Sequence, residues 1–75
     1  MFNNEFLELL QKELQDINVT LEMNQEMLNK CTTKSKKYPI FKKLRNNIKK
    51  RIEILEELRK LKEKEIDFAN KRLKL

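Results

Sequence analysis

The sequence predicts an all-α protein, an antiparallel two-helix hairpin of coiled-coil type that dimerises into a four-helix bundle. Its 75 residues include no glycine and one proline, Pro39, so β-hairpin turns and glycine-rich loops have almost nothing to be built from. Charged residues make up 40% of the chain and hydrophobic ones 39%, a balance typical of long helices. Apolar residues recur in alternating steps of three and four on both sides of a polar break. This regular spacing argues against disorder, the competing interpretation of so much charge.

The first helix is expected over residues 3–31. Asn3 is a suitable N-cap, because its side-chain oxygen can accept a hydrogen bond from a free amide of the first turn. Asn24 interrupts an otherwise apolar stripe, where it either fixes the helix register as a buried polar residue or faces solvent at a splayed end. The stripe consists of Leu7, Leu10, Leu14, Ile17, Leu21, Asn24, Leu28 and Cys31.

A turn is expected over residues 32–38. Thr32, Thr33 and Ser35 favour turns and caps over helix interiors. The residue before a proline is pushed out of the helical region, whereas a proline suits the first position of a new helix. A connection this short joins antiparallel neighbours.

The second helix is expected over residues 39–74. Closing the hairpin near residue 35 predicts that Leu14 packs against Leu58 and Leu10 against Leu61. The apolar residues expected to face the first helix are Ile40, Phe41, Leu44, Ile48, Ile52, Leu55, Leu58, Leu61, Ile66, Ala69 and Leu73.

A second apolar stripe on this helix repeats every seven residues and has no partner within the hairpin. The end of the second helix is also expected to project beyond residue 1. A chain of 75 residues is marginally stable alone, which favours association through such a stripe. The alternative is that these are singly exposed apolar residues, which are normal on protein surfaces. The predicted self-association or partner face comprises Ile54, Leu61, Phe68, Leu73 and Leu75.

The composition argues against an enzyme. There is no histidine, no glycine-rich loop and only one cysteine, so no metal-ligand spacing or nucleophilic constellation can be formed, and no cofactor or metal is expected. Cys31 cannot form an internal disulfide and is expected to be a small buried hydrophobic residue. The alternatives are an intermolecular disulfide or a redox-sensitive thiol activated by Lys30 and Lys34.

Charge is distributed unevenly. Residues 1–29 carry a net charge of −5, residues 30–52 carry ten basic and no acidic residues, and residues 53–75 carry +1. A hairpin gathers the basic segment at its tip, where free amides, the helix dipole and lysines together attract anions. Tyr38 can stack on bases there, whereas the simplest alternative is a solvated charged face. The predicted anion- or nucleic-acid-binding residues are Lys34, Lys36, Lys37, Tyr38, Lys42, Lys43, Arg45, Lys49 and Lys50.

The expected function is a non-enzymatic protein-interaction module that self-associates and docks on a larger protein through an apolar helix face, such as an adaptor, an assembly factor, or a regulator or inhibitor encoded by a phage or mobile element. The alternative is sequence-independent nucleic-acid binding through the basic tip. Membrane association is disfavoured, because the apolar residues of the basic segment are needed to cover the first helix. A cytoplasmic location is expected, since no secretory signal or membrane-length apolar run is visible. Fourteen lysines against four arginines are typical of AT-rich genomes, including those of phages and mobile elements.

Overall fold

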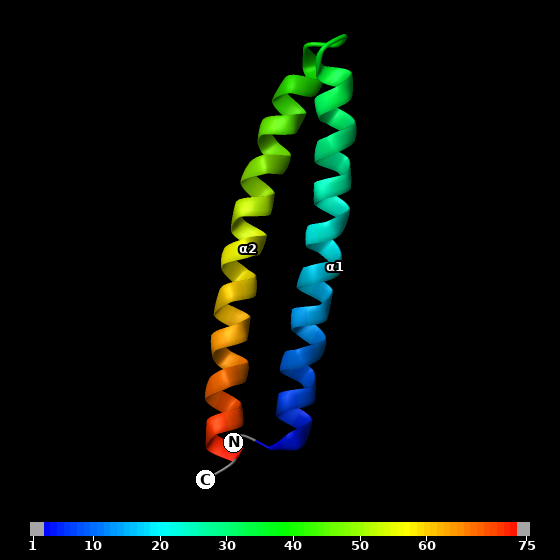
Figure 1. Cartoon of the computed structure of the whole chain (residues 1–75). Coiled ribbons are helices and arrows are strands. Elements are labelled where there is room, and N and C mark those ends of the chain that lie inside the picture. The colour runs from blue at the N-terminus through cyan, green and yellow to red at the C-terminus, as the bar shows by residue number, and fades with distance from the viewer. Residues whose placement is uncertain (1–2, 74–75) are drawn as a thin grey trace.

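The chain forms two long antiparallel helices joined by a short turn (Figure 1). The computed structural model describes residues 3–73, except for the side chain of Ser35. Helix α1 spans Asn4–Ser35 and helix α2 spans Ile40–Leu73. Together they make a rod of 57 × 15 × 13 Å. The predicted antiparallel hairpin is therefore confirmed, and its dimerisation stays a prediction.

Helix α1 begins at the expected cap. The Asn3 Oδ1 accepts a hydrogen bond from the backbone amide of Phe6 at 2.8 Å, and the Asn3 carbonyl accepts one from the amide of Leu7 at 3.0 Å. These bonds satisfy two of the amides that a helix start leaves without intrahelical partners.

Helix α1 ends four residues later than expected. Thr32 and Thr33 are helical, and their hydroxyls donate to the carbonyls of Leu28 and Asn29 at 2.8 and 3.2 Å. This bonding to the preceding turn lets a threonine remain in a helix despite its preference for turns. The turn predicted over 32–38 is thus wrong in its first half, because the helices are joined by residues 36–39.

The two helices meet along one line of residues, which we call the interhelix seam. Every seam residue is buried or half-buried, and Ile48 is fully buried. Leu21, Cys31, Ile48 and Ile52 pack together as a buried core cluster. The seam consists of Leu7, Leu10, Leu14, Ile17, Leu21, Asn24, Leu28 and Cys31 in α1 and of Phe41, Arg45, Ile48, Ile52, Leu55, Arg59, Lys62, Ile66, Ala69 and Leu73 in α2.

The prediction for α1 is confirmed residue by residue, whereas part of the prediction for α2 is wrong. Leu58 and Leu61 are 44% and 56% exposed, and the half-buried seam positions beside them belong to Arg59 and Lys62. Ile40 and Leu44, expected to face α1, are exposed as well. Helix α2 carries two apolar lines one residue apart, and the line with more apolar members faces α1.

The register of the hairpin also differs from the expected one. Among residues 3–73, two side-chain hydrogen bonds cross between the helices, from Arg51 to Asn24 and from Lys62 to Glu13. They lie about one helical turn from the predicted pairing of Leu10 with Leu61. Because α1 runs further towards the tip, the two helices finish level at the other end of the rod (Figure 1), and the predicted overhang of α2 is absent from the described residues.

Within residues 3–73, neither helix combines the length and the apolar character that a bilayer-spanning segment needs.

Candidate functional site

One feature of the surface stands apart, namely a set of large hydrophobic residues that the hairpin leaves exposed. Nine of them each immediately precede a seam residue in the sequence, and their exposed fractions range from 40% to 73%. We call this set the apolar face. It consists of Leu9, Met23 and Met27 of α1 and Ile40, Leu44, Ile54, Leu58, Leu61 and Phe68 of α2.

The geometry of antiparallel helices places all nine residues on the same side of the rod. One residue corresponds to about 100° of rotation, so a position just before the seam lies roughly at right angles to it. Viewed down the rod, the step from a seam residue to the residue before it turns clockwise about one helix axis and anticlockwise about the other, because the helices run in opposite directions. Since they also face each other, both steps lead to the same side of the hairpin.

The opposite side of the rod is polar throughout the described chain. Each of the 17 residues that directly follow a seam residue is charged, an amide or a threonine. The two sides thus differ sharply, because the positions before the seam contribute the whole apolar face and those after it contribute no apolar side chain.

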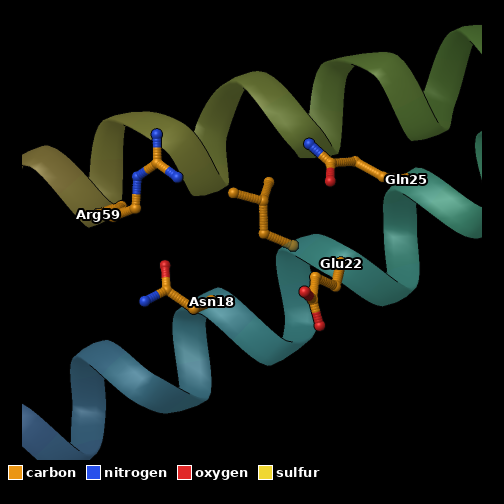
Figure 2. Close-up of a pocket in the computed structure, with 5 residues that line it drawn as sticks. Asn18, Glu22, Gln25 and Arg59 are labelled. Carbon is orange, nitrogen blue, oxygen red and sulfur yellow. The ribbon is translucent and has the colours of Figure 1, made fainter.

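A groove of about 480 Å³ opens beside Leu21, on the polar side. Figure 2 shows Asn18, Glu22 and Gln25 on α1 with Arg59 across from them on α2. The Arg59 Nε lies 3.8 Å from a Glu63 carboxylate oxygen. Two amides, the Glu22 carboxylate and the Arg59 guanidinium line the groove, and no cluster of metal-ligating side chains exists among residues 3–73.

One polar contact that crosses the hairpin joins Lys62 of α2 to Glu13 of α1. The Lys62 ammonium donates to a Glu13 carboxylate oxygen at 3.0 Å and lies 3.5 Å from Glu65. The hydrogen bond from Lys62 to Glu13 raises the pKa of Lys62 above its ordinary value of 10.5, with the charges of Glu65 and Glu13 adding to this and partial burial opposing it.

Asn24 is buried, with 5% of its surface exposed. Its Nδ2 donates to the Thr20 carbonyl at 2.7 Å, and its Oδ1 accepts from the Arg51 guanidinium at 3.1 Å. Of the two alternatives that the sequence left open, the structure selects the buried one. A buried amide with a partner across the hairpin ties α1 to α2 at one register.

The basic tip keeps its charge unneutralised. We define it as Lys34, Lys36, Lys37, Lys42, Lys43, Lys49 and Lys50, which are all exposed. Within the described chain no carboxylate pairs with any of them, since the salt bridges there involve only Arg59 and Lys62 as cations. The first turn of α2 has no acidic residue. The lysines therefore lie together with the positive end of the α2 dipole.

The aromatic residues at the tip pack on each other. Tyr38 is half exposed and meets Phe41 edge to face, with ring centroids 6.1 Å apart and ring planes at 62°. The Lys34 ammonium lies 5.5 Å from the centre of the Phe41 ring. Arg45, predicted to be part of the anion site, is half-buried in the seam instead, and its Nε is buried without a hydrogen-bond partner among residues 3–73.

The residues predicted for the partner face do not all lie on one surface. Ile54, Leu61 and Phe68 lie on the apolar face, Leu73 belongs to the seam, and Leu75 falls outside the described residues. The Arg72 guanidinium lies 5.1 Å from the centre of the Phe68 ring. Sequence reasoning missed the remaining members, which could have been found by reading the residue before each seam position: Leu9, Met23, Met27, Ile40, Leu44 and Leu58.

Comparison with protein-family models, with curated proteins and with solved structures gives no match for this chain. Its function therefore has to be argued from the two surfaces described above.

Proposed function

We propose that this chain is a non-enzymatic protein-interaction module whose apolar face is its contact surface. Self-association and docking on a larger protein, as an adaptor, assembly factor or regulator would do, both use this face.

The placement of Leu58 and Leu61 carries the proposal. At one level of the rod these leucines point outward, while Arg59 and Lys62 take the half-buried seam positions. A hairpin shaped only for its own stability would place them the other way round, because burying a leucine contributes about 1.5–3 kcal/mol. Placing the leucines outside and the charged residues in the seam is favourable when another surface covers the leucines.

The size of the face supports the same conclusion. Taking roughly 200 Å² for a fully exposed residue of this size, the nine residues leave on the order of 900 Å² open to solvent. Singly scattered apolar residues are normal on a surface, whereas exposed apolar residues gathered on one side of a molecule mark an interaction site.

The test compares two charged double variants. Leu58→Glu/Leu61→Glu alters the apolar face, whereas Gln11→Glu/Gln15→Glu alters exposed residues of the polar side. Each tagged protein is expressed in the native host and purified with and without nuclease. We expect a bound protein that survives nuclease, is lost from the leucine variant and is kept by the glutamine variant. Equal recovery with both variants would contradict the proposal.

A second candidate function is sequence-independent binding of nucleic acid by the basic tip. It is favoured by the seven exposed lysines without carboxylate partners. Phosphates would supply the missing negative charge, and binding would weaken steeply with salt because counterions are released. A fluorescence anisotropy titration with a short single strand checks this. We expect Lys42→Glu/Lys43→Glu/Lys49→Glu/Lys50→Glu to abolish binding, and absence of a complex at low salt would dismiss this candidate.

A further inference from the structure

We propose that the occupant of the apolar face is a second copy of this chain, laid antiparallel, so that the two basic tips lie at opposite ends of a four-helix bundle. This inference rests on the proposed function, which makes the face a contact surface, and it specifies the partner and its orientation.

The available area suits a second copy. A stable protein–protein interface typically buries about 800 Å² on each partner. The apolar face exposes an area on the order of 900 Å², which is of this size. The face runs along the rod from Ile40 near the tip to Phe68 near the other end. A two-fold interface uses the same surface on both subunits, so one face along the rod is enough.

The spacing of the face matches itself when reversed. In α2 the residues that precede the seam follow steps of three and four, so an antiparallel copy with its two-fold axis at Glu56 brings each of them opposite another such residue. Ile54 then meets the partner's Leu58, and Leu44 meets the partner's Phe68. In α1 the corresponding register brings Leu9 against the partner's Met27.

Polar residues also precede the seam, and in this register Arg51 falls opposite the partner's Leu61 and Arg72 opposite the partner's Ile40, where the long stems of the arginines can cover apolar surface. Asn47 falls opposite the partner's Glu65, which can accept a hydrogen bond from its amide. Arg51 already donates to Asn24, and Glu13 already accepts from Lys62. Covering Glu13 is less costly than covering an isolated charge, because Lys62 carries the opposite charge.

Charge decides between the antiparallel and the parallel orientation. Residues 20–55, the half of the rod that includes the tip, carry ten basic and three acidic residues, a net charge of +7. Residues 4–19 and 56–73, at the other half, carry seven basic and nine acidic residues, a net charge of −2. A parallel dimer would place +7 beside +7, whereas the antiparallel dimer places each +7 half beside a −2 half.

The experiment measures mass and orientation together. The exposed Lys36 at the tip is changed to cysteine in a Cys31→Ala background and carries a spin label. Light scattering gives the mass, and pulsed electron–electron double resonance gives the distance between the two spin labels. We expect the mass of two chains and a distance of about 50 Å, since the two tips are then separated by most of a helix length at 1.5 Å per residue. A distance below about 25 Å would overturn the antiparallel orientation.

Two further outcomes separate this inference from the proposed function. With Leu58→Glu/Leu61→Glu added, we expect the Kd of the dimer to rise at least about tenfold and the long distance to disappear, while Gln11→Glu/Gln15→Glu leaves both unchanged. A parent protein that stays a single chain at high concentration overturns the second copy. If the parent is a single chain, the proposed function still holds when the purified Leu58→Glu/Leu61→Glu variant loses a host protein that the Gln11→Glu/Gln15→Glu variant keeps. If both variants keep that protein, the proposed function fails as well.

Discussion

At the scale of single residues, the hairpin is aligned by polar side chains as well as by its apolar core. Asn24 uses both ends of its amide, one on its own helix and one on Arg51 of α2. Lys62 reaches from the seam to Glu13 on α1. Each contact exists in one register only, because shifting α2 by a turn would leave a buried or half-buried polar group without its partner.

Lys62 makes stability depend on alkaline pH. Its pKa is raised in the folded chain, chiefly by the hydrogen bond to Glu13, so its stabilising contribution is complete below the ordinary value of 10.5 and is lost as the pH rises through the folded value. We expect the parent to lose stability relative to Lys62→Met as the pH rises above 10.5, with no such loss below that value. Urea unfolding across this range measures the difference. Lys60→Met on the polar side is the control, and an identical alkaline trend for both variants would refute the assignment.

At the scale of the helices, α2 is an amphipathic helix with two apolar lines, and only one of them faces α1. The seam line includes Phe41, Ile48, Ile52 and Leu55, and it tolerates Arg59 and Lys62 because long side chains can cover apolar surface with their stems while their charges reach water. The cost is an interhelix contact weaker than an all-leucine seam would provide.

This deficit predicts a stabilising substitution. Arg59→Leu puts an apolar side chain in a half-buried seam position and removes only a 3.8 Å ion pair that is largely exposed. We expect a gain of about 1 kcal/mol, which for a chain of this size raises Tm by about 4–8 °C. Thermal unfolding followed by circular dichroism checks this. Lys60→Leu, one residue further and exposed, should change stability by less than about 0.5 kcal/mol. A lower Tm for Arg59→Leu would contradict the seam assignment.

At the scale of the whole molecule, the rod has three distinct surfaces: an apolar side, a polar side and a basic tip. The apolar side lies on both helices at once because antiparallel helices turn their corresponding positions to the same side. A thin rod of two helices can bury few residues, and six hydrophobic residues are buried within the described chain. Association through the apolar side would add the burial that one hairpin lacks.

If two copies share this face, stability must depend on protein concentration. Each tenfold increase in concentration should stabilise the dimer by about 1.4 kcal/mol and raise its Tm. Calorimetry over a hundredfold concentration range measures this. The Leu58→Glu/Leu61→Glu variant should unfold at a Tm that does not change with concentration. A constant Tm for the parent would show that its cooperative unit is the single hairpin.

The sequence by itself determined the two helices, their antiparallel arrangement, the N-cap at Asn3, the whole α1 seam and the gathering of lysines at the tip. These follow from local chemistry: spacing in steps of three and four, the absence of glycine, and one proline placed where a second helix can begin. Periodicity and capping act within a few residues, so they can be recognised without knowing what lies across the fold.

Only the tertiary structure decided which apolar line of α2 faces α1, and with it the exposure of Leu58 and Leu61. The two lines are one residue apart, so a rotation of about 100° exchanges them, and local spacing favours neither strongly. The turn decided the register, because Thr32 and Thr33 stay helical through bonds to carbonyls that a propensity argument does not count. Packing across the hairpin resolved both questions: in the observed rotation and register, Ile48, Ile52 and Ala69 of α2 are buried, as are Leu10 and Leu21 of α1.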